Sequence, residues 1–96
     1  MKIIAIERVV TGTDDKKLRS LLKSEAKQVW NLYKNETVRE IYFTKKNHRA
    51  VLVIECRNEI VAKKILNTLP LVKEKLIQFE ILPLQAYDGF ERLFKN

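Results

Sequence analysis

One carboxylate stands inside an apolar helical stripe. Between Lys16 and Lys34, apolar residues recur with the period of an α-helix and form one predicted face: Leu18, Leu21, Leu22, Ala26, Val29, Leu32 and Tyr33. Glu25 falls inside the same arc. Because a buried, unpaired carboxylate loses its hydration, such a group usually has a partner or a chemical task. Glu25 is therefore a candidate functional residue. The competing interpretation is a structural ion pair or a side chain that reaches water.

Three further side chains are candidates for a ligand site. Arg39 opens a predicted strand beside Glu40, and Tyr42 lies on the same strand face as Glu40. Trp30 stands at the border of the apolar helical arc. A structural role is equally open for each: an ion pair for Arg39, and packing for Tyr42 and Trp30.

Composition limits the classes of protein. Ninety-six residues with two glycines and two prolines predict a single ordered domain over residues 1–96. The sequence contains no run of about 18 apolar residues, the length that would predict a membrane span. One His and one Cys argue against a metal site, and two isolated glycines argue against a phosphate-binding loop, so we expect no cofactor. Cys56 is expected to be a small buried hydrophobe in the reducing cytoplasm.

The predicted elements follow the order strand, helix, strand, strand, helix, strand. Patterning places them at Lys2 to Val10, Lys16 to about Asn35, Val38 to Lys45, Arg49 to Cys56, a helix capped by Asn58, and Ile77 to Leu84. Pro70 ends the second helix or begins a short further piece. This order predicts an α+β, ferredoxin-like βαββαβ domain with a four-stranded antiparallel sheet and two helices on one face. Residues 85–96 carry three aromatic side chains and are expected to dock on a neighbour.

The strands have two apolar faces. In the predicted third strand, Ala50, Leu52 and Ile54 point to one face, and Val51 and Val53 point to the other. Two helices cover only one face of such a sheet, so the other face needs a lid. A second copy is the economical lid, and we expect a homodimer whose sheets face each other.

Short motifs support a resemblance to a known family. The stretch from Glu25 through Thr37-Val38-Arg39 to Leu69-Pro70-Leu71 resembles the muconolactone isomerase family, and the strand Ile77-Gln78-Phe79-Glu80-Ile81 resembles its following acidic strand. The resemblance implies a dimeric α/β barrel, often assembled into larger rings, with a cleft for a small anionic organic metabolite. It also implies cofactor-free proton transfer, with Glu25 as the base and Arg39 as the anchor for the substrate carboxylate. Tyr42 and Trp30 would form the pocket wall.

Other functions remain to be weighed. The net charge of +7 and the βαββαβ order also suit an RNA-binding module, but the strand from Arg49 to Cys56 lacks the aromatic residues on which such modules stack bases. A non-catalytic ligand-binding or structural dimer would need the same pocket without turnover. A monooxygenase-like reaction also fits the fold class, although His48 alone, in a predicted turn, gives poor support for haem ligation.

Overall fold

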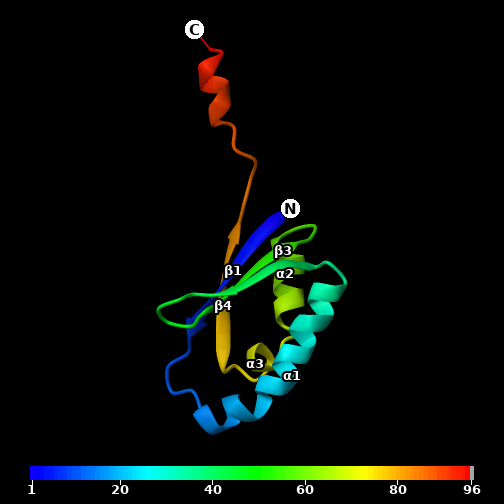
Figure 1. The fold of residues 1–96 in the computed structure, drawn as a ribbon, viewed down its shortest axis with the longest axis vertical. Coiled ribbons are helices and arrows are strands. Elements are labelled where there is room, and N and C mark those ends of the chain that lie inside the picture. The colour runs from blue at the N-terminus through cyan, green and yellow to red at the C-terminus, as the bar shows by residue number, and fades with distance from the viewer. Residues whose placement is uncertain (96) are drawn as a thin grey trace.

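The computed structural model describes residues 1–95. It contains four strands, three helices and a 3-10 turn in the order β1 (Lys2–Val9), α1 (Asp15–Lys34), β2 (Val38–Phe43), β3 (Ala50–Glu55), α2 (Glu59–Leu66), α3 (Pro70–Lys73), β4 (Ile77–Pro83) and η1 (Gly89–Leu93). Figure 1 shows the elements packed at one end of an elongated molecule. Each predicted strand and helix is present, and its ends agree with the expected ends within three residues.

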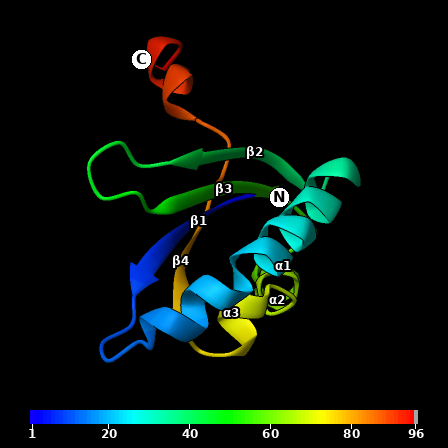
Figure 2. The ribbon, with the colours of Figure 1, turned by 60° about the horizontal axis from the view of Figure 1, so that its bottom comes forward.

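The four strands form one antiparallel sheet in the order β2-β3-β1-β4. The helices lie together on one side of this sheet (Figure 2). This α+β arrangement is consistent with the ferredoxin-like fold predicted from the element order. The register pairs Ile3 with Ile54 and Ala5 with Leu52, so these four residues share the helix-covered face.

The main core lies between this face and the helices. All four of those strand residues are buried, and they pack with residues from α1, α2 and the segment before α3: Leu32, Ala62, Leu66 and Leu69. Fully burying such aliphatic side chains stabilises the fold by about 1.5–3 kcal/mol each. The opposite face of the sheet carries Ile4, Ile6 and Val51, which are half-buried, and no helix within residues 1–95 covers it.

Side-chain caps fix where the two longer helices begin. The Asp14 carboxylate accepts hydrogen bonds from the amides of Lys16 and Lys17, and the Asn58 side chain accepts one from the amide of Val61. Pro70 does not simply end α2. It occupies the first turn of α3, where its missing N–H costs nothing.

The apolar stripe of α1 is less covered than its periodicity predicts. Leu32 is the buried residue of this helix, whereas Leu22, Ala26 and Tyr33 are exposed. The reason is geometric: α1 contacts β2 and α3, and between these contacts it stands away from the sheet. Much of the stripe therefore borders open space.

The C-terminal segment leaves the body of the protein. After β4 the chain extends away and ends in the short turn η1 (Figure 1). Between residues 85 and 95, its large apolar side chains are exposed, from 67% for Phe90 to 84% for Phe94. Within the segment, Tyr87 packs edge-on against Phe90, with ring centroids 4.9 Å apart. Docking of residues 85–96 on a neighbour stays a prediction.

Over the described part of the chain, no helix is both long enough and apolar enough to cross a membrane.

Candidate functional site

A large cavity opens between α1 and the sheet. Its volume is about 770 Å³, within the usual range for a site that takes a small organic molecule. We call it the α1 cavity. Its wall is mostly apolar, and its charged lining residues are Glu7, Glu25 and Arg49. The exposed part of the α1 stripe forms one side, and Ile41 and Phe43 of β2 form the other.

Glu25 points from the middle of α1 towards the start of α3. Its Oε1 accepts a hydrogen bond from the Leu71 amide at 2.9 Å. That amide lies in the first turn of α3, where backbone N–H groups have no acceptor within the helix, and the N-cap Leu69 supplies no side-chain oxygen. The carboxylate therefore caps α3 from another helix. This contact also joins two of the motifs on which the family resemblance is based, the helix that carries Glu25 and the Leu69-Pro70-Leu71 triplet.

The surroundings of Glu25 favour its protonated form. Burial raises the pKa of the Glu25 carboxyl, the Leu71 hydrogen bond opposes this effect, and the nearby negative charge of Glu7 raises the pKa further. A carboxylate with a raised pKa is a stronger base than an ordinary carboxylate and can return the proton that it takes up. Thus Glu25 combines an apolar cavity, a fixed position and acid–base character.

Glu7 and Arg49 were not among the predicted site residues. The Oε1 of Glu7 accepts a hydrogen bond from the Ala50 amide at 2.9 Å, and its Oε2 lies 3.8 Å from a terminal guanidinium nitrogen of Arg49. Strand alternation could have found Glu7, because it shares a face with the buried Ile3 and Ala5. Arg49 precedes β3 in the chain, and its sequence position carries no comparable signal.

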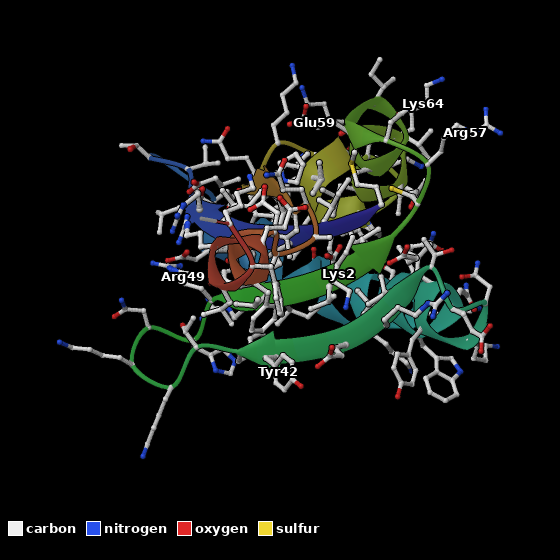
Figure 3. All side chains as sticks on the ribbon, turned by 90° about the horizontal axis from the view of Figure 1, so that it is seen from above. Lys2, Tyr42, Arg49, Arg57, Glu59 and Lys64 are labelled. Atoms are coloured by element: carbon white, nitrogen blue, oxygen red, sulfur yellow. The ribbon has the colours of Figure 1, made fainter. Side chains whose placement is uncertain are left out.

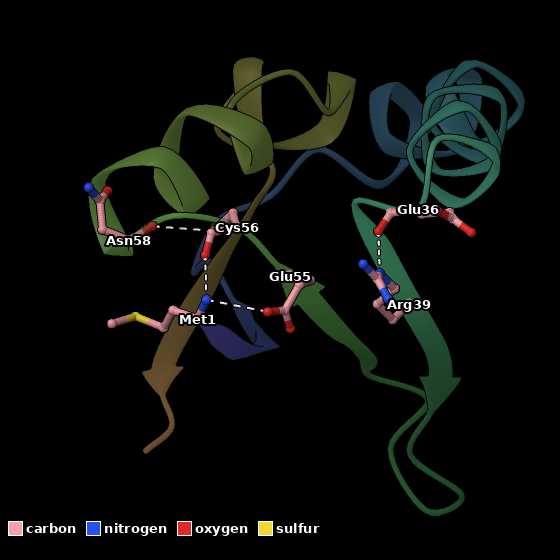
Figure 4. A network of polar contacts seen from close by, with 6 residues as sticks. All are labelled: Met1, Glu36, Arg39, Glu55, Cys56 and Asn58. Atoms are coloured by element: carbon pink, nitrogen blue, oxygen red, sulfur yellow. Dashed lines mark hydrogen bonds and ion pairs between the residues drawn. The ribbon is translucent and has the colours of Figure 1, made fainter. Parts of the chain in front are cut away.

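The structure does not bring Arg39 to Glu25. Arg39 is the extra residue of a β-bulge in β2, since Val38 pairs with Ile54 and Glu40 pairs with the adjacent Val53. Its Nε donates a hydrogen bond to the Glu36 carbonyl at 2.6 Å, at the junction of α1 and β2 (Figure 4). Arg39 is absent from the lining of the α1 cavity.

Tyr42 lies on the other face of the sheet. It pairs with Val51, whereas the neighbouring pair, Ile41 and Leu52, faces the helices. Its hydroxyl donates a hydrogen bond to Glu40 Oε1 at 2.7 Å, and this bond to a carboxylate raises the pKa of the Tyr42 phenol. Figure 3 shows the ring on the outside of β2. Within one chain, Tyr42 therefore does not share the cavity of Glu25.

Trp30 lines the α1 cavity. The residue is 55% exposed, and its ring stacks on Tyr33, with centroids 6.1 Å apart. On the opposite side, His48 stacks on Phe43 at 3.9 Å between centroids. Flat, exposed rings on both sides of an opening suit a ligand with an apolar, planar body.

Among residues 1–95, no group of three or more His, Cys, Asp or Glu side chains is arranged to hold a metal ion. Cys56 is free and half-buried, at the end of β3. Its Sγ lies 3.3 Å from the Asn58 carbonyl, as part of the contacts that also tie down the Met1 amino group (Figure 4).

No family model matches the chain, and no curated protein is significantly similar to it. The resemblance to muconolactone isomerases therefore stays a prediction.

Proposed function

We propose that this protein binds a small anionic organic metabolite in the α1 cavity and catalyses a cofactor-free proton transfer on it, as a muconolactone isomerase-like enzyme would. The observation that carries this proposal is the Glu25 carboxylate, which has a raised pKa and lies in a large and mostly apolar cavity. The proposed setting is the cytoplasm, where the single Cys56 stays reduced.

The proposed reaction uses Glu25 as both base and acid. Its carboxylate takes a proton from a carbon next to a conjugated carbonyl, and the electron pair left behind spreads into that carbonyl. The protonated Glu25 then returns the proton to another carbon of the conjugated system, which moves the double bond and restores the carboxylate. The apolar wall excludes water and raises the pKa of the base above that of an ordinary carboxyl.

The test is proton exchange in deuterated water. We would incubate the protein with five-membered unsaturated lactones, with and without a carboxymethyl group, and follow deuterium incorporation by NMR. Glu25→Gln should lose the exchange, because an amide cannot accept the proton, whereas Glu59→Gln should keep it. Glu59 is an exposed residue in the first turn of α2, outside the cavity, and its change removes the same charge.

A specific observation favours the alternative, a non-catalytic ligand-binding dimer. The hydrogen bond to Leu71 gives Glu25 a structural role that needs no reaction. Ligand binding without exchange above the rate in buffer, or full exchange in a folded Glu25→Gln variant, would replace the catalytic proposal with this one.

The same proposal includes a homodimer. The helix-free face of the sheet presents Ile4, Ile6 and Val51 as an apolar centre, and charged side chains such as the Arg8–Glu80 pair flank it. A second copy would cover this face and would also offer a surface for the exposed C-terminal segment.

A further inference from the structure

Arg49 is a cation whose hydrogen-bonding capacity is unused. Its backbone amide donates to Thr44 Oγ1 at 2.9 Å, which fixes the main chain at the end of the β2–β3 turn. Its guanidinium lies 3.8 Å from Glu7, longer than the 2.7–3.2 Å of an ordinary N–H···O bond. The side chain is 37% exposed, whereas Glu7 is 17% exposed. In the described residues, no hydrogen bond from the Arg49 guanidinium is formed, so its planar set of donors is available.

The other arginines near β2 and β4 are already engaged. Arg39 donates to the Glu36 carbonyl, and Arg8 forms a hydrogen-bonded pair with Glu80 on the far face of the sheet. Among the lining residues of the α1 cavity, Arg49 is the one Arg or Lys. The rest of the lining is mostly apolar, apart from His48 and the acids Glu7 and Glu25.

This distribution divides the cavity into three parts. Arg49 supplies a positive end near the β2–β3 turn, and Trp30 with Phe43 borders an apolar opening. Glu25 lies on the α1 side. A ligand that satisfies all three parts has one carboxylate and a flat apolar body, because a guanidinium binds a carboxylate through two parallel hydrogen bonds.

We propose that Arg49, and not Arg39, is the carboxylate-binding residue of the α1 cavity, and that the cavity takes aromatic or conjugated monocarboxylates. Glu7 is the internal competitor: it holds the guanidinium in place when the cavity is empty and yields it to the ligand. This inference rests on the proposed function only in using the same cavity.

The experiment measures ligand binding by tryptophan fluorescence. Trp30 is the single tryptophan of the chain and lines the cavity, so it reports directly on occupancy. The probes are 1-naphthoate and its uncharged analogue naphthalene-1-carboxamide. Replacing Arg49 by Gln should weaken 1-naphthoate binding about 10- to 100-fold, the usual size of a lost charge-assisted contact, and leave carboxamide binding within about twofold.

Arg39→Gln is the matched control, with the same loss of charge outside the cavity, and it should leave both probes unaffected. Glu7→Gln should change the affinity for 1-naphthoate in the opposite direction. The glutamine keeps an oxygen acceptor for the Ala50 amide but frees Arg49, so 1-naphthoate should bind several-fold more tightly. Circular dichroism of each variant checks that the fold is retained.

The outcomes separate this inference from the proposed function. If both probes bind and Arg49→Gln affects them equally, or if Arg39→Gln causes the loss, the role of Arg49 is overturned while the cavity stands. If neither probe binds to the wild-type protein, the inference that the cavity takes aromatic monocarboxylates is overturned, and deuterium exchange with the lactones decides the proposed function independently.

Discussion

Two substitutions of Glu25 separate its charge from its hydrogen bond. Gln keeps the size of the side chain and an oxygen that can accept the Leu71 N–H, but it carries no charge. Leu also carries no charge, fits the apolar stripe, and leaves that N–H without its partner. The two uncharged variants therefore differ in the cap on α3 and in the apolar area that leucine buries.

The expected magnitudes follow from the local structure. Leu71 is buried, and orphaning its amide costs about 1–3 kcal/mol. Burying roughly half of a leucine side chain in place of Glu25 returns about 1 kcal/mol. The Glu25→Leu variant should thus be less stable than Glu25→Gln by about 1 kcal/mol, which corresponds to a difference in Tm of about 4–8 °C for a domain of this size.

The ionisation of Glu25 should make the free energy of unfolding depend on pH. Since the folded-state pKa of Glu25 is raised above the ordinary value of 4.5, the folded protein holds a proton that the unfolded chain has already released. The resulting stabilisation is fully present below pH 4.5 and is lost as the pH rises through the raised pKa. Relative to Glu25→Gln, the wild-type protein should therefore lose free energy of unfolding as the pH rises from 4.5 through the raised pKa of Glu25.

Urea unfolding between pH 4 and pH 8, followed by circular dichroism, measures both effects. Parallel curves for wild type and Glu25→Gln would refute the perturbed carboxyl. A Leu variant more stable than the Gln variant by about 1 kcal/mol, the gain from burial alone, would refute the cap on α3.

Two further outcomes concern self-association. Val51→Lys places a charge at the centre of the helix-free sheet face and should convert the proposed dimer to a monomer in light scattering. The control Asn47→Lys, in the exposed β2–β3 turn, should leave the dimer intact. A dimer in both variants would reject this face as the interface. Removal of residues 85–96 should weaken the dimer. It should leave a cooperative urea transition, because the exposed segment contributes no residue to the core. An unchanged monomer–dimer equilibrium would show that the segment does not dock on the partner.

The fold was predictable because its signals are local. Asn58 marks the start of α2 through a cap that depends on the next three residues, and Pro70 begins α3 through its fixed φ. Alternation in β3 assigned Leu52 and Val51 to opposite faces, which the register confirms for the helix-covered side. None of these signals depends on distant parts of the chain.

The site was only partly predictable because its members meet through tertiary structure. The position of Glu25 in an apolar arc correctly indicated a partly buried carboxylate, and Trp30 does share its cavity. One bulged residue, Arg39, shifts the register of β2, and no pattern in the sequence marked that bulge. Tyr42 could have been placed correctly from its alternation with Ile41. Arg49 lies close to Glu7 through the pairing of two distant strands, which short-range patterns do not encode.

β2 and β4 are the two edge strands of the sheet, and each could in principle recruit a strand from another molecule. Both carry features that interrupt such recruitment. The bulge at Arg39 breaks the even spacing of backbone groups along β2, and charged side chains flank it. Pro83 removes an N–H from the end of β4. The protein can therefore keep a large apolar surface for binding while its sheet edges resist the open-ended strand addition that leads to fibrils.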